Sequence, residues 1–152
     1  MKLELDEKLV FRDVKASTNQ EIIQFLAEKL YENNYVNEDY IATIQAREAE
    51  YPTGLPSTPP GIAIPHANFE MVRKTTLAIA TLENSVQFQS MDDKSVQLPI
   101  QIVIMMAIGE PHGQVEMLQK VVSIIQDEPL RAQMIAAKTD QELLNLLEKA
   151  VA

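Results

Sequence analysis

The sequence predicts an α/β fold, a three-layer sandwich in which helices flank a mixed β-sheet. Three observations lead to this prediction: two amphipathic helical segments come first, apolar strand-like segments follow, and three helical segments close the chain. Helices on either side of a strand-rich centre can cover both faces of one sheet. The 152 residues, 46% of them hydrophobic, contain no internal repeat or long linker, so we expect a single domain over residues 1–152.

The N-terminal part favours one strand and then two helices. Residues 9–14 form an apolar strand-like run, and the Thr-Asn-Gln-Glu sequence from Thr18 to Glu21 is a capping box that begins a helix. The inward face of this helix is Ile22, Phe25, Leu26 and Leu30. A second helix begins near Asn37 and ends before Pro52, with an expected inward stripe of Tyr40, Ile44, Arg47 and Tyr51.

The central part favours strands, and the C-terminal part favours helices. Residues 62–64 and 76–82 are strand-like, and we expect 85–90 to pair with 76–82. Residues 96–108 first alternate and then become almost wholly apolar, which is typical of a strand covered on both faces. Helices are expected at 111–126, at 128–137 and after 139; the first carries Val115, Leu118, Val122 and Ile125 on one face.

The composition excludes several classes of protein. The chain has no cysteine, so disulfides, cysteine-ligated metal and a cysteine nucleophile are excluded, and a reducing cytoplasm suits it. A net charge of −9 argues against general binding of nucleic acid. No signal peptide is visible at the N-terminus, and the longest apolar run, 102–108, is too short to span a bilayer.

His66 is the first candidate for a functional residue. It follows Pro65 at the end of the strand-like 61-GIAIP-65 run. Proline fixes its own φ and holds the preceding residue extended, so the backbone that enters His66 is stiff. A stiff backbone favours a histidine that must present one ring nitrogen in a fixed direction. The alternative is that Ile-Pro-His only turns the chain.

His112, the other histidine, and Arg47 are the second and third candidates. His112 follows Glu110 and Pro111 at an expected helix start, where free amides attract anions. Both histidines follow apolar strands, whose ends can converge on one crevice. Arg47 stands at a core-facing position, so its guanidinium needs an anion or an acceptor. Alternatively, it packs its stem on the core and pairs with a nearby glutamate.

Together these residue types describe a phosphohistidine site. A neutral imidazole attacks phosphorus through one ring nitrogen, while the other nitrogen needs an acceptor to fix the tautomer. Arg47, His112 and helix amides would stabilise the charge of the transferring phosphoryl group. Thr53 and Thr58 could add hydroxyl donors.

Rival chemistries have less support. There is no glycine-rich phosphate loop for direct use of ATP and no nucleophile elbow for a serine hydrolase. The two histidines and Glu110 could hold zinc, but no closely spaced ligand pair supports this.

Three segments, 47-REAEYPTGL-55, 61-GIAIPHA-67 and 112-HGQVEMLQKV-121, resemble the enzyme IIA domain of the phosphoenolpyruvate-dependent sugar phosphotransferase system, in its fructose–mannitol superfamily. The Tyr-Pro-Thr-Gly-Leu segment is most similar to the galactitol branch. The resemblance implies that His66 is the phosphorylated histidine, with Arg47 and His112 as the other active-site residues. It implies no cofactor and no metal.

The resemblance also implies partners. The histidine-containing phosphocarrier protein would donate the phosphoryl group, and a cysteine of enzyme IIB would accept it, in the cytoplasm, for a membrane permease. A regulatory relative, which binds targets according to the phosphorylation state of His66, would share the same site. A non-catalytic binding or scaffold domain, in which His66 is only a turn residue, is the third alternative.

Overall fold

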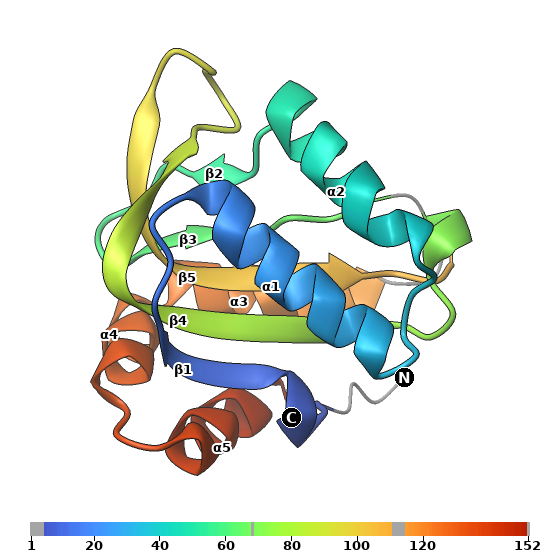
Figure 1. Cartoon of the computed structure of the whole chain (residues 1–152). Helices are drawn as coiled ribbons and strands as arrows, with labels where there is room; N and C mark the ends of the chain where they lie inside the picture. Colours follow the sequence, from blue (N-terminus) through green and yellow to red (C-terminus); the bar gives the residue numbers. More distant parts are fainter. Residues whose placement is uncertain (1–4, 68, 111–114, 152) are drawn as a thin grey trace.

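The computed structural model describes residues 5–67, 69–110 and 115–151 and confirms the α/β prediction. One mixed five-stranded sheet lies between two layers of helices (Figure 1). The strand order is β1-β4-β5-β3-β2. The strands are β1 (Val10–Val14), β2 (Gly54–Leu55), β3 (Gly61–Ala63), β4 (Thr76–Gln89) and β5 (Gln97–Ala107).

The sheet is mixed because its pairings alternate in direction. β1 runs parallel to β4, β4 antiparallel to β5, β5 parallel to β3, and β3 antiparallel to β2. Since β3 and β5 are parallel neighbours, the segments that follow them leave the sheet at the same end, where both strands have their C-termini. The Pro65-His66 segment lies at this end.

The first helical layer contains α1 (Asn19–Glu32) and α2 (Asp39–Glu50), with short 3₁₀ turns at Glu7–Leu9 and Phe69–Met71. The capping box is confirmed: Thr18 Oγ1 accepts from the Glu21 N–H, and the Glu21 carboxylate accepts from the Ser17 N–H. The inward residues of α1 pack on one face of the sheet, where β5 contributes Val103 and Met105.

The second helical layer contains α3 (Val115–Gln126), α4 (Glu128–Ala136) and α5 (Asp140–Val151). On this face β5 contributes Ile102, Ile104 and Met106, so its side chains alternate between two buried layers, as the sequence predicted. Helix α3 buries Met117, Val121 and Ile124. Its other apolar stripe, Val115, Leu118 and Val122, is exposed.

One predicted pairing is wrong. Residues 76–82 and 85–90 do not pair with each other, because residues 76–89 form one continuous strand, β4, that pairs with β5. The polar Glu83-Asn84-Ser85 run is an exposed part of this strand, where its register with β5 shifts, rather than a turn. The chain reverses instead at residues 90–96, and this long hairpin projects past the helices (Figure 1).

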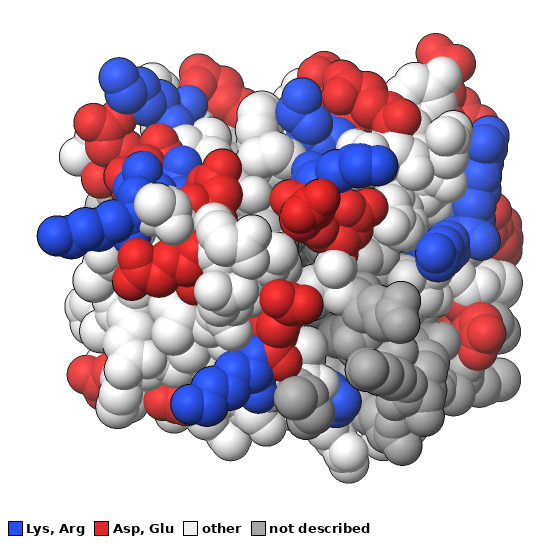
Figure 2. Space-filling view, turned by 90° about the horizontal axis from the view of Figure 1, so that it is seen from below, with Lys and Arg blue, Asp and Glu red and all other residues white. Residues whose placement is uncertain are grey.

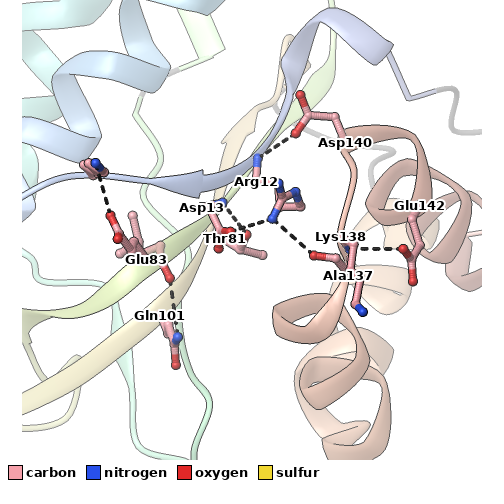
Figure 3. Close-up of polar contacts among 11 residues, drawn as sticks. Arg12, Asp13, Thr81, Glu83, Gln101, Ala137, Lys138, Asp140 and Glu142 are labelled. Atoms are coloured by element: carbon pink, nitrogen blue, oxygen red, sulfur yellow. Dashed lines mark hydrogen bonds and ion pairs between the residues drawn. The ribbon is translucent and has the colours of Figure 1, made fainter.

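Side-chain hydrogen bonds join β1, at one edge of the sheet, to β4 and α5 (Figure 3). Asp13 lies in the left-handed region, with φ of 52°, and its N–H donates to the buried Thr81 hydroxyl at 3.1 Å. The Arg12 N–H donates to Asp140 Oδ1 at 3.1 Å, and the Arg12 guanidinium donates to the Ala137 carbonyl. These contacts hold the start of α5 against the sheet.

Charged side chains of both signs are interspersed over the face shown in Figure 2, and no broad basic surface appears there. Among the described residues, no helix is both long and apolar enough to span a membrane.

Candidate active site

His66 lies directly beside the end of β5. The chain reaches His66 from β3 through Pro65, and the Pro65 carbonyl accepts a hydrogen bond of 2.9 Å from the Met106 N–H. His66 itself pairs with Met106 in a parallel bridge. The Met106 carbonyl in turn accepts a hydrogen bond of 3.1 Å from the buried Tyr40 hydroxyl of α2. The backbone around His66 is therefore held from both sides.

The ring of His66 is half-buried and has a defined tautomer in its neutral form. Nδ1 lies 2.9 Å from the carbonyl oxygen of Ile64. A carbonyl oxygen can only accept, so Nδ1 must carry the proton, and in the neutral ring the lone pair is on Nε2. The sequence predicted an acceptor of this kind, and the residue two positions earlier supplies it. Nε2 is therefore the ring nitrogen with a lone pair available for bonding.

His66 and Arg47 line the same open pocket, of about 330 Å³. Its other lining residues come from the segment after Arg47 and from the β4–β5 hairpin: Glu50, Tyr51, Pro52, Thr53, Met91, Asp92 and Lys94. The structure thus brings together two of the three predicted site residues, which are 19 positions apart in the sequence.

Arg47 is half-buried in the last turn of α2, with its guanidinium 5.4 Å from the centre of the Tyr51 ring. Its Nε is buried and has no hydrogen-bond partner among the residues that the structure describes. A buried N–H without an acceptor is costly unless an anion or water satisfies it. The pocket therefore contains a guanidinium suited to bind an oxyanion.

The expected inward stripe of α2 is partly wrong. Tyr40 and Ile44 are fully buried, but Tyr51 is 58% exposed, and the third inward residue is Glu48 rather than Arg47. The Glu48 carboxylate accepts from the Thr53 hydroxyl at 2.6 Å and from the Thr53 N–H at 2.8 Å. Burial raises the pKa of Glu48, and these two hydrogen bonds act in the opposite direction.

Thr53 and Thr58 do not act as we expected. The Thr53 hydroxyl is committed to Glu48, although the residue lines the pocket. Thr58 does not line it: its hydroxyl donates to Glu128 at 3.1 Å and accepts from the buried Arg131 of α4. The loop before β3 is therefore attached to α4.

The hairpin residues Met91, Asp92 and Lys94 are site residues that sequence reasoning missed. They reach the pocket because the hairpin folds back over β2, where the Met91 N–H donates to the Gly54 carbonyl at 2.8 Å. No local pattern in residues 90–96 indicates this contact. Lys94 and Arg47 supply two positive charges, balanced by Glu50 and Asp92.

His112 lies outside the described residues, so its place in the site remains a prediction. Two observations bear on it. The strand that precedes it, β5, ends at Ala107, and Met106 of that strand is the bridge partner of His66.

A family model, described as phosphoenolpyruvate-dependent sugar phosphotransferase system, EIIA 2, matches residues 4–150. The chain belongs to this EIIA family. It is 30% identical over 147 residues to a fructose-specific EIIA component from Haloferax volcanii, covering 95% of this chain and 92% of that protein. Members of the family are phosphotransferases that act through a phosphohistidine, and this EIIA domain is one of them.

Two further relatives bear on how an EIIA domain is used. One is a solved structure, the complex of mannitol enzyme IIA with phosphorylated mannitol enzyme IIB from Escherichia coli. It matches this chain with a TM-score of 0.79 and 25% identity, and the match covers 97% of this chain and 99% of the other. The transcriptional regulator ManR of Bacillus subtilis is 30% identical over 133 residues, which are 87% of this chain. The chain spans only 19% of ManR.

Proposed function

We propose that this EIIA domain accepts a phosphoryl group on Nε2 of His66 from the histidine-containing phosphocarrier protein and passes it to a cysteine of an enzyme IIB. One observation carries the proposal: the Ile64 carbonyl holds Nδ1, which leaves the lone pair on Nε2, and His66 lines the same pocket as Arg47. A neutral imidazole with a fixed tautomer is the form that attacks phosphorus.

Each transfer exchanges one bond to phosphorus for another. In the first, Nε2 of His66 attacks the phosphorus of the donor's phosphohistidine; a new N–P bond forms, the donor's N–P bond breaks, and its electron pair returns to the donor's ring. In the second, a thiolate of enzyme IIB attacks the same phosphorus, and the N–P electron pair returns to Nε2. The proton stays on Nδ1 throughout, donated to the Ile64 carbonyl.

Arg47 stabilises the transferring group. The phosphoryl oxygens carry negative charge through both transfers, and a guanidinium can donate two parallel hydrogen bonds to them. The buried, unpartnered Nε of Arg47 supports this role. His112 adds a second donor in this proposal, at the start of the segment that follows β5.

Exposed apolar side chains beside the pocket support docking of protein partners. Tyr51 is 58% and Met91 43% exposed, and both line the pocket. Aromatic residues and methionine are enriched where proteins bind each other. The E. coli complex with phosphorylated enzyme IIB supports the same class of partner.

The phosphoryl group serves sugar uptake through a membrane permease, and the chain works in the cytoplasm. The Tyr-Pro-Thr-Gly-Leu segment, 51–55, favours galactitol as the sugar. Uptake assays with the cognate enzyme IIB and permease, comparing galactitol with fructose and mannitol, test this assignment.

The deciding experiment is intact-mass spectrometry at neutral to alkaline pH after incubation with phosphoenolpyruvate, enzyme I and the phosphocarrier protein. We expect one acid-labile phosphoryl group on the wild type and none on His66→Ala. Arg47→Lys should remain folded and accept the group more slowly, because lysine loses the bidentate geometry. If the wild type stays unmodified while the upstream proteins phosphorylate a known EIIA, the proposal is wrong.

A second candidate function is regulatory, and the similarity to ManR favours it. In that case the phosphorylation state of His66 controls binding to a target instead of supplying a sugar. Transfer from the phosphorylated chain to the cognate enzyme IIB separates the two: rapid transfer supports transport, and a stable phosphorylated chain with no acceptor supports regulation.

A further inference from the structure

Glu48 is the most deeply buried charged residue next to the pocket, at 5% exposed, and it contacts the segment between α2 and β3. Its two carboxylate oxygens are both used by Thr53, one by the hydroxyl and one by the backbone N–H. Thr53 is itself buried, at 3% exposed. A buried carboxylate with two donors from one residue fixes the position of that residue closely.

Thr53 is in turn bonded to the residue that holds the histidine. The Thr53 carbonyl accepts from the Ile64 N–H at 3.2 Å, and the Ile64 carbonyl accepts from His66 Nδ1 at 2.9 Å. Three consecutive links, from Glu48 to Thr53, from Thr53 to Ile64 and from Ile64 to His66, therefore connect the carboxylate to the imidazole.

We propose that Glu48 is a positioning residue that sets the tautomer and orientation of His66 through Thr53 and Ile64. The catalytic consequence rests on the proposed function of His66, but the effect on the tautomer does not. Without Glu48, the peptide of Thr53 loses its anchor, and the Ile64 carbonyl is no longer held against Nδ1. The imidazole can then place its proton on Nε2, the atom that must be free to attack.

The position of Glu48 on α2 directs its side chain away from that of Arg47. Arg47 and Glu48 are consecutive, so their side chains leave the helix about 100° apart. Arg47 lines the pocket, and Glu48 is buried beneath the segment that leads out of α2. One turn of one helix thus positions both the guanidinium and, indirectly, the imidazole.

The test compares Glu48→Gln and Thr53→Val with the wild type, using the whole chain. Glutamine can accept from only one Thr53 donor, because its NH₂ group faces the other. Valine keeps the shape of Thr53 and its N–H but removes the hydroxyl. Thr53→Ser, which keeps the hydroxyl, is the conservative rescue, and the exposed Glu148→Gln of α5 is the matched control.

The first readout is the ¹⁵N NMR shifts of the His66 ring in its neutral form, which report the tautomer without any phosphorylation. We expect the wild type, Thr53→Ser and Glu148→Gln to carry the proton on Nδ1, and both test variants to show a mixture of tautomers. An unchanged tautomer in folded Glu48→Gln, or in Thr53→Val should the first variant fail to fold, would overturn the inference.

The second readout is the rate of phosphoryl acceptance at varied donor concentration. We expect kcat to fall by on the order of tenfold or more in the test variants, because a small misplacement of the reacting group is costly. KM should change less than kcat, since the exposed docking side chains Tyr51 and Met91 are not themselves replaced. A shifted tautomer with normal kcat would overturn the catalytic role. If the wild type takes up no phosphoryl group, that result contradicts only the proposed function.

Discussion

Replacing the buried Arg131 should destabilise the fold strongly, because this side chain joins three segments. Arg131 is 2% exposed, and its guanidinium donates to the carbonyls of Pro60 and Thr58 at 3.1 Å, to the Thr58 hydroxyl at 3.1 Å, and to the Ile125 carbonyl. It thus holds the loop before β3 against the last turn of α3. That loop leads into β3, and His66 follows this strand.

The magnitude follows from the acceptors left behind. Arg131→Met keeps most of the volume but removes every donor, which leaves three backbone carbonyls without these partners. A hydrogen bond from a charged donor contributes about 1.5–3 kcal/mol. Thr58 is exposed and Pro60 and Ile125 are only half-buried, so water offsets part of the loss, and we expect about 3 kcal/mol for the whole set. For a chain of this length, that loss lowers Tm by roughly 6–12 °C.

Denaturant unfolding, followed by circular dichroism, measures this loss directly. The matched control is Arg73→Met, which makes the same change at an exposed arginine and should alter the free energy of unfolding by less than about 0.5 kcal/mol. If Arg131→Met loses less than about 1 kcal/mol, the hydrogen bonds of Arg131 do not hold the loop, and the reasoning is refuted.

Two further predictions concern α2. Tyr40→Phe removes the hydroxyl that donates to the buried Met106 carbonyl, so it should lower the free energy of unfolding in denaturant by about 1–3 kcal/mol. The control, Tyr31→Phe at an exposed tyrosine, should change it very little. Equal losses in the two variants would contradict this prediction. Burial raises the pKa of Glu48, so the folded chain binds its proton more tightly than the unfolded chain does. The stability of the wild type relative to Glu48→Gln should therefore fall as the pH rises above about 4.3, the ordinary pKa of a glutamate, and a constant difference would argue against the burial effect.

The fold was predictable because its signals are local. The capping box at Thr18 and the continuous apolar run of β5 each follow from neighbouring residues, and both are confirmed. The two faces of α3 show the limit of such signals. Two apolar stripes of α3 have helical spacing: Val115, Leu118 and Val122, which are exposed, and Met117, Val121 and Ile124, which are buried. Periodicity alone could not decide which of the two stripes is buried.

The same limit explains the errors in α2 and β4. Tyr40, Ile44 and Glu48 follow a spacing of four, but glutamate is almost never fully buried unless it has a partner, so its residue type does not indicate an inward position. The polar run from Glu83 to Ser85 has the composition of a turn, yet β4 continues through it. In both cases the tertiary structure supplies a partner or a register shift that the local sequence does not contain.

The candidate site was predictable only in part, for a related reason. His66 stands out in the sequence through Pro65, and Arg47 through its helical spacing from Tyr40 and Ile44, although the structure places Glu48 inward instead. Lys94 and Met91 reach the pocket only because a hairpin folds back onto β2, and no feature within that hairpin indicates its destination.

The arrangement separates two tasks that phosphoryl transfer requires. In the proposed mechanism, the charge on the phosphoryl group is met by Arg47 and Lys94, two side chains that line an open pocket. The tautomer of the neutral His66 ring is set instead by a backbone carbonyl, which does not titrate. Because the two tasks use different groups, the proposed transfers with two different proteins would use one pocket while the same ring nitrogen keeps its lone pair. A side-chain acceptor exposed in the pocket would not give this independence, since each partner could compete for it.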